Sequence, residues 1–341
     1  MMTDGRRDAD VVEVTRRVAD DVLLPASDAL DQSQTRPVAQ LRALADEGLF
    51  GLAGPVEAGG WDCDLATSCG VVEVLAAACL TTTFVWIQHH AVVRAVRRSP
   101  DPLRSLYLEG LCHGRRRGGV VLAGLRPGPS SLLARHARGA WSLSGTVPWF
   151  TGWGQVDIAL VAARTPDQQV LFALLDLAPD DRTLTFAPQR LLALQSSSTG
   201  SLTFDETPVA ADRVLGLEPH AGWSDGAGLR LNGALGLGVA ARCLDELDEL
   251  DELDDDGLRP ELQRLRTRLH EVDDGSVATV RAEIVAFSFR CAGTLLASQG
   301  SDGMRGQGPA ARRYREAGFL LTFGQRPAIK THLLQLLGAT R

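Results

Sequence analysis

The chain has 341 residues, of which 45% are hydrophobic, enough to bury a large core in two or three packed layers. Its formal net charge of −7 argues against nucleic acid as a partner. Because no apolar run approaches the roughly 18 residues that a bilayer-spanning helix needs, we expect no membrane association. Residues 1–8 lack the apolar segment of a secretory signal, so we expect a cytoplasmic protein with a frayed leader.

The cysteines show no spacing typical of a metal site. There is no Cys-x-x-Cys pair, and no histidine stands at ligand spacing. In a cytoplasmic protein such residues are typical of buried, reduced thiols, so we expect no metal ion. The six are Cys63, Cys69, Cys79, Cys112, Cys243 and Cys291.

The first third of the chain has the periodicity of helices. Apolar residues recur at helical spacing over residues 11–24 and 37–50. Residues 65–78 and 81–97 are largely apolar, as expected for buried members of a bundle. We therefore expect an N-terminal helical domain over residues 1–118.

The pattern changes at Gly118 and Gly119, where short β-rich runs separated by turns begin. Many short strands with polar breaks favour a small barrel or a sandwich, and we expect a middle β-barrel domain over residues 119–218. From residue 222 the chain is helical again, which gives a shortened C-terminal helical bundle over residues 219–341. The expected strands are 120–125, 140–144, 157–163, 170–176, 184–187 and 201–204.

Residues 244–256 form an acidic repeat of Leu-Asp-Glu triplets. On a helix, acids four residues apart repel each other, so the repeat is unfavourable in helical form. We expect a solvated, frayed helix end here, followed by a turn at residues 257–260.

Residues 145–157 carry the most informative pattern, Gly-Thr-Val-Pro-Trp-Phe-Thr-Gly-Trp-Gly-Gln-Val-Asp. A strand end and a glycine-bracketed loop present an aromatic ring, Trp149, together with a hydroxyl, Thr151. A flat conjugated ring needs such a pair, one group to cover its face and one to bond an edge atom. Alternatively, Trp149 and Phe150 belong to the core and Thr151 is a turn residue.

This stretch resembles the flavin loop of the acyl-CoA dehydrogenase superfamily, whose usual form is Trp-Ile/Val-Thr-Asn/Gly-Gly. Residues 44–60 are similar to the family's Gly-Leu-x-Gly-x-Pro-x-Glu-x-Gly-Gly segment, and residues 194–214 to its Phe-Asp-x-x-Pro-Val exit from the β domain. Residues 315–325 are similar to the end of its helical bundle. The resemblance implies an N-terminal helical domain, a central β-barrel and a C-terminal four-helix bundle, assembled as a homodimer or homotetramer.

The resemblance implies FAD as the cofactor. Trp149 would cover one face of the flavin, with Phe150 beside it, and Thr151 would contact the N5/O4 edge. In a second family loop, here residues 125–131, Ser131 falls on a serine that contacts the flavin, and Ser130 would contact the substrate; alternatively, both serines are ordinary polar residues of a loop. This loop departs from the family at its start: Leu125 replaces a threonine that bonds the flavin, and Arg126 replaces an acid.

The family's general base is missing. It is usually a glutamate late in the last helical segment, where this chain has Gly324, and a second subgroup carries it where this chain has Leu229. Losing such a base typically lowers the rate by about 10² to 10⁴. Glu316 is close in sequence, but we expect it to form a helix-surface ion pair with Arg312 or Arg313.

Two histidines lie on an otherwise apolar helix. His89 and His90 could face the acyl pocket as acid or base, or could be satisfied core residues.

Three features bear on coenzyme A and the FAD phosphates. Arg230 matches a family arginine on the CoA side of the substrate, and could equally form an ion pair at a helix end. Residues 115–117, three arginines, could attract phosphate or cap a helix end. The family's Arg-x-x-Phe segment, which reaches a neighbour's FAD pyrophosphate, has no counterpart in the acidic repeat.

Three functions remain open. The first is an FAD-dependent oxidoreductase that oxidises an acyl thioester bound to CoA or a carrier protein, with its base unidentified. The second is a flavin-dependent monooxygenase of the same superfamily, which needs no such base. The third is a non-catalytic homologue, or a partner subunit of a complete paralogue.

Overall fold

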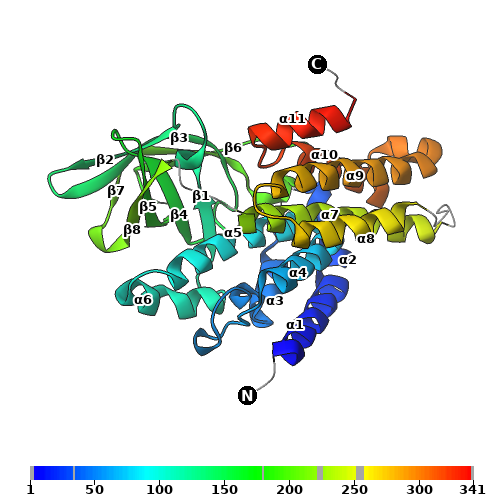
Figure 1. Ribbon diagram of the computed structural model, residues 1–341, viewed down its shortest axis with the longest axis horizontal. Helices are drawn as coiled ribbons and strands as arrows, with labels where there is room; N and C mark the ends of the chain where they lie inside the picture. The colour runs from blue at the N-terminus through cyan, green and yellow to red at the C-terminus, as the bar shows by residue number, and fades with distance from the viewer. Residues whose placement is uncertain (1–3, 34, 179, 221–225, 251–256, 339–341) are drawn as a thin grey trace.

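The computed structural model describes residues 4–33, 35–178, 180–220, 226–250 and 257–338. Figure 1 shows a β-sheet at one end of the molecule and two sets of helices, from the beginning and the end of the chain, packed against each other at the other end. The N-terminal helices are α1 (Asp4–Val18), α2 (Leu24–Gln32), α3 (Val38–Asp46), α4 (Leu65–Ala78), α5 (Leu80–Arg97) and α6 (Asp101–Cys112), and a π-helical turn (Ala19–Leu23) joins the first two.

The sheet has eight strands in the order β6-β7-β3-β2-β4-β5-β8, with β1 pairing β4 alongside this path. The strands are β1 (Gly118–Val121), β2 (Leu132–Ala137), β3 (Ala140–Phe150), β4 (Ile158–Arg164), β5 (Gln169–Asp176), β6 (Leu184–Pro188), β7 (Gly200–Val209) and β8 (Val214–Pro219). The sheet is open, with β6 and β8 at its ends, so the predicted closed barrel is wrong.

Helices cover the outer face of the sheet, and this explains why it does not need to close on itself. Every residue of β4 is buried. Ile158 and Leu160 pack in one cluster with Val92 of α5 and Tyr107 of α6, whereas the alternate residues of β4 face the interior of the sheet. Both faces of the central strand are thus removed from water.

The C-terminal helices are α7 (Gly226–Asp248), α8 (Leu258–Glu271), α9 (Val277–Ser298), α10 (Pro309–Thr322) and α11 (Pro327–Leu336). Helix α7 lies directly against α4: a Cβ at Gly238 would come within 2.3 Å of the Glu73 carbonyl oxygen. The two helical sets share one core cluster, so neither buries its apolar face alone. Among the described residues, no helix is long and apolar enough to cross a membrane.

The acidic repeat differs in part from its prediction. Residues 251–256 lie outside the described residues, but Leu244 and Leu247 are fully buried on α7. Glu246 is also buried, because it pairs with Arg313 of α10. The predicted turn at residues 257–260 is wrong, since α8 begins at Leu258.

Glu316 also differs from its prediction. Its partners are the predicted ones: Arg313, 2.9 Å away, and Arg312, 3.8 Å away. However, all three side chains are buried. The pair belongs to the core, because α10 packs between α7, α9 and α2. Of the six cysteines, five are buried and Cys63 is half-buried.

Candidate functional site

Two loops meet at one end of the sheet, and a third enters it further along β3. Strand β2 begins opposite the middle of β3, with Leu132 paired with Gly145. Phe150, the last residue of β3, pairs with Gly200, the first of β7, and Gly200 pairs with the end of β6. The loops of residues 151–157 and 189–199 therefore meet at this end, which we call the loop end of the sheet, and the loop of residues 125–131 leads into β2 beside the middle of β3.

The predicted flavin-binding residues differ in exposure. The side chain of Trp149 is 54% exposed at the surface. Phe150 is fully buried and lies edge-on against the ring of Trp153, so it offers no surface to a ligand. Thr151 is half-buried, and its hydroxyl lies 3.0 Å from the hydroxyl of Thr199. An accessible ring and a hydroxyl therefore lie side by side in the chain.

Backbone bonds hold the Thr151 loop against the loop of residues 189–199. The amide of Gly152 donates to the carbonyl oxygen of Ser197 at 3.0 Å, and the amide of Trp153 donates to that of Ser198 at 3.2 Å. Gly152 has a φ of +89°, and a Cβ there would lie 3.1 Å from Val156. Glycine relieves both restrictions, which explains the glycine after Thr151.

The loop of residues 189–199 supplies hydroxyl groups that the sequence analysis did not single out. Ser197 and Thr199 are buried, and their hydroxyl oxygens lie 2.8 Å apart. Ser196 bonds the carbonyl oxygens of Leu30 and Ser33, which anchors the loop to the end of α2. The signal in the sequence was the run of hydroxyl residues before β7, but a run of this kind is typical of any polar loop.

The loop of residues 125–131 is held at its start and open at its tip. Arg164 donates to the carbonyl oxygens of Gly124 and Arg126. The Ser130 hydroxyl bonds the backbone of Leu132, as in a local turn. Ser131 is exposed and therefore remains accessible to a ligand.

Gly324 lies in the turn between α10 and α11, beside a buried arginine. Arg281 of α9 donates to the carbonyl oxygens of Phe323 and Gly324, at 2.6 Å and 2.9 Å. Gly324 has a φ of +56°, and a Cβ there would lie 3.1 Å from the guanidinium. The position where the resemblance places a carboxylate thus has no side chain, and a cation lies next to it. Nothing in the sequence pointed to Arg281.

The two other positions discussed for chemistry are also buried. Leu229 lies in the core of α7. The Arg230 guanidinium bonds Asp274, at 2.5 Å, and the carbonyl oxygens of Leu269 and Val272. These contacts match the ion-pair alternative for Arg230 and leave the CoA contact as a prediction.

His89 and His90 are fully buried. The amide of Gly118 donates to Nδ1 of His89 at 2.8 Å, so this ring joins α5 to the start of β1. Burial lowers the pKa of His89 to about 3, and burial also lowers that of His90 well below its ordinary value. Both rings are therefore neutral at physiological pH. The hypothesis that they act as acid or base near neutral pH is not supported by this environment.

The three arginines after α6 have partners within the chain. Arg115 pairs with Glu109 at 2.7 Å, and Arg116 with Asp176 at 3.3 Å. Arg117 lies over the ring of Phe50. These contacts are those of a helix-end cluster.

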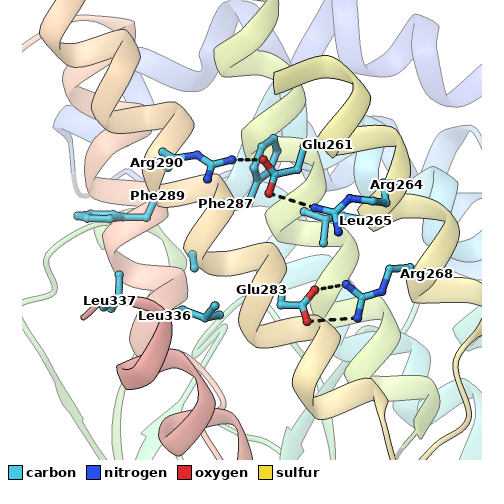
Figure 2. Close-up of a pocket in the computed structure, with 11 residues that line it drawn as sticks. Glu261, Arg264, Leu265, Arg268, Glu283, Phe287, Phe289, Arg290, Leu336 and Leu337 are labelled. Atoms are coloured by element: carbon cyan, nitrogen blue, oxygen red, sulfur yellow. Dashed lines mark hydrogen bonds and ion pairs between the residues drawn. The ribbon is translucent and has the colours of Figure 1, made fainter. Parts of the chain in front are cut away.

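A groove of about 500 Å³ lies away from the loop end, between α8, α9 and α11. Figure 2 shows that its charged groups pair with each other: Glu261 with Arg264 and Arg290, and Glu283 with Arg268. Since these guanidinium groups already have partners, the groove is a weaker candidate for an anionic ligand than its arginine content suggests.

Comparison with known proteins agrees with this architecture. The family "Acyl-CoA dehydrogenase, N-terminal domain" matches residues 7–115. The chain is 24% identical to the human mitochondrial short-chain specific acyl-CoA dehydrogenase over 249 residues, which is 69% of this chain and 60% of that protein. The match thus spans about three fifths of the curated relative.

Solved structures share the whole fold. Butyryl-CoA dehydrogenase from Megasphaera elsdenii superposes with a TM-score of 0.80 at 18% identity, covering 99% of this chain and 98% of that one. Dibenzothiophene monooxygenase (TdsC) from Paenibacillus sp. A11-2 gives 0.79 at 17% identity, covering 96% of each chain. Together with the matched N-terminal domain and the curated relative, these shared folds support membership of the acyl-CoA dehydrogenase superfamily.

Proposed function

We propose that this protein is a flavin-dependent oxidoreductase that binds FAD at the loop end of the sheet and acts on an acyl thioester, carried by CoA or by a carrier protein. The observation that carries the proposal is the pair formed by the exposed ring of Trp149 and the hydroxyl of Thr151. Open surface for stacking and a hydroxyl in a rigid loop are the two features that a flat heteroaromatic ring requires.

The residues present fit such a ring. When bound, FAD supplies a hydride acceptor. Trp149 would stack on the ring, Thr151 would bond its edge, and exposed Ser131 would contact it from the neighbouring loop. Ser130 would lie toward the substrate, and Arg230 toward its CoA side. Backbone hydrogen bonds to the loop of residues 189–199 hold the Thr151 loop, so the Thr151 hydroxyl is positioned before a ligand arrives.

Gly324 favours a second candidate, a flavin-dependent monooxygenase of the same superfamily. Oxidation of an acyl thioester requires removal of an α-proton, and neither Gly324 nor Leu229 can accept one. Monooxygenation with reduced flavin and O₂ needs no such base. The shared fold with dibenzothiophene monooxygenase is compatible with this candidate.

The first test is retention of the cofactor. The purified protein is mixed with excess FAD, free ligand is removed, and the visible spectrum gives the ratio of FAD to protein. We expect a ratio near one for the wild type and a clear loss for Trp149→Ala. A folded wild-type protein that retains no flavin would contradict both flavoenzyme candidates and leave a binding or partner-subunit role.

The second test separates the two candidates. Bleaching of the flavin band by acyl-CoA would support the dehydrogenase-like activity, whereas bleaching only by a reductant supplied with NADH would support the monooxygenase. We also infer a cytoplasmic homodimer or homotetramer, and light scattering of the purified protein measures its mass in solution.

A further inference from the structure

Three hydroxyl groups form a continuous row from the interior to the candidate site. The Ser197 oxygen lies 2.8 Å from the Thr199 oxygen, and the Thr199 oxygen lies 3.0 Å from the Thr151 oxygen. Ser197 and Thr199 are buried, and Thr151 is half-buried. The row therefore begins in a dry environment and ends at Thr151, two residues after Trp149 in the chain.

The backbone brings these groups together at a cost. Ser198, between the two buried hydroxyl residues, has a φ of +51°, in the left-handed region that residues with a side chain rarely adopt. Leu194, earlier in the same loop, also lies there, with a φ of +60°. Such conformations persist only where the surrounding structure fixes them. Here the amides of Gly152 and Trp153 bond the carbonyl oxygens of Ser197 and Ser198.

Burial determines the direction of the hydrogen bonds in the row. A hydroxyl has one proton, and a buried proton without an acceptor is costly. Among the described residues, Thr199 is the one acceptor within reach of the Ser197 hydroxyl. Ser197 therefore donates to Thr199, and the Thr199 proton is directed to Thr151. The Thr151 oxygen accepts this bond, which leaves its own proton to point outward.

We infer that Ser197 and Thr199 are positioning residues that orient the Thr151 hydroxyl as a hydrogen-bond donor toward the bound ring. The inference rests on the proposed function, because it assumes a ligand at Thr151. It also specifies that ligand: the atom facing Thr151 must be an acceptor, as the unprotonated nitrogen and the carbonyl oxygen on the edge of oxidised FAD are. A chain of bonds pointing one way also strengthens each member by polarisation.

A double-mutant cycle on FAD affinity tests the inference. Dissociation constants are measured by titration for the wild type, Thr151→Val, Thr199→Val and the double variant. We expect Thr151→Val to weaken FAD binding about tenfold, as loss of one hydrogen bond would. Thr199→Val should weaken it about threefold when Thr151 is present, and by less than twofold in the Thr151→Val background. Thr199→Ser, which keeps the hydroxyl, should bind as the wild type does.

Two further variants keep the result interpretable. Thr199→Val leaves the Ser197 hydroxyl without its acceptor, so Ser197→Ala/Thr199→Val is measured as well, and it should show the same coupling to Thr151. The matched control is Thr203→Val on β7, which removes a hydroxyl pair outside the row: the Thr203 oxygen lies 2.9 Å from that of Thr146 on β3. This control should not change FAD affinity.

The outcomes separate the inference from the proposed function. Wild-type protein that does not bind FAD overturns both. Wild-type protein that binds FAD, with a Thr199→Val effect that is equal in both backgrounds or absent, overturns the positioning role and leaves the FAD site standing. An effect that disappears with Thr151 supports the row.

Discussion

Buried polar groups are paired differently in the C-terminal bundle and at the loop end of the sheet. In the bundle, Arg313 and Glu316 are fully enclosed and neutralise each other. At the loop end, the uncharged hydroxyl groups of Thr151, Thr199 and Ser197 bond one another, and the backbone amide of Gly152 donates to the Ser197 carbonyl oxygen. Charge in this chain therefore serves mainly to join helices, and its arginine clusters are poor guides to the ligand site.

The largest effect should come from breaking the charge pairing in the bundle. Burial alone would lower the pKa of Arg313, but Glu316 and Glu246 offset this and hold it above its ordinary value. Arg313→Met would remove the fully buried cation that the two carboxylates share, leaving Glu316 with Arg312 at 3.8 Å and Glu246 with Arg242 at 3.0 Å. We expect the free energy of unfolding to fall by about 3–5 kcal/mol, measured by urea denaturation.

The control for this prediction is Arg305→Ala. Arg305 pairs with Asp302 at 3.3 Å, and both side chains are exposed, so its loss should cost less than about 1 kcal/mol. If Arg313→Met costs no more than Arg305→Ala, the buried pair does not stabilise the bundle.

The next effect should come from the contact between the two helical sets. A Cβ at Gly238 would lie 2.3 Å from the carbonyl oxygen of Glu73, which is backbone and cannot move alone. Gly238→Ala should therefore cost about 3 kcal/mol, since α7 and α4 must separate. Gly293→Ala on α9 is the matched control: nothing lies within 4 Å, and it should stabilise by about 0.5–1 kcal/mol. Equal effects of the two substitutions would argue against tight packing at Gly238.

The sequence predicted those parts of the fold whose signals are local, and it missed those that depend on contacts between distant residues. The apolar period over residues 65–78 predicted α4 with its observed ends, because that signal is local. Strand β2 (Leu132–Ala137) was missed because four of its six residues are exposed. The open sheet was mistaken for a barrel, since closure depends on whether β6 and β8 pair, and the spacing of strands carries no information about this.

The site was predictable only in its local part. Trp149 and Thr151 stand two residues apart, where β3 passes into the following loop, and the sequence pattern pointed to both. Thr199 bonds Thr151 across 48 residues, and Arg281 bonds Gly324 across 43. Neither contact produces a periodic pattern in the sequence. In the same way, the acidic repeat was expected to be solvated because Arg313, which pairs with Glu246 in addition to Arg242 on the same helix, lies far along the chain.

A smaller effect, and one that depends on pH, should come from His89, at the joint between the helices and the sheet. Because burial holds its folded pKa at about 3, below the ordinary value of 6.5, the unfolded chain binds a proton that the folded chain excludes. Stability should therefore be unaffected above pH 6.5, and should fall by up to about 1.4 kcal/mol per pH unit as the pH drops from 6.5 toward 3.

His89→Asn tests this effect, because an amide oxygen can still accept the bond from the Gly118 amide. The measurement is the free energy of urea unfolding between pH 7 and pH 5, compared with the wild type. The variant should lose less stability over this range. His136→Asn, on the exposed part of β2, is the matched control. Parallel curves for the wild type and His89→Asn would contradict a buried neutral ring.

The smallest effect on stability should come from the residue that matters most to the proposed ligand. Trp149 is more than half exposed, so Trp149→Ala should change the free energy of unfolding by no more than about 1 kcal/mol, while FAD affinity falls at least tenfold. Trp153 is the matched control, since its ring stacks on Phe186 at 5.1 Å and packs against the core of the sheet. Trp153→Ala should lower the free energy of unfolding by about 3 kcal/mol. If Trp149→Ala lowered the free energy of unfolding strongly but left FAD affinity unchanged, the exposed ring would have a structural role. That result would contradict the proposal that FAD binds at the loop end.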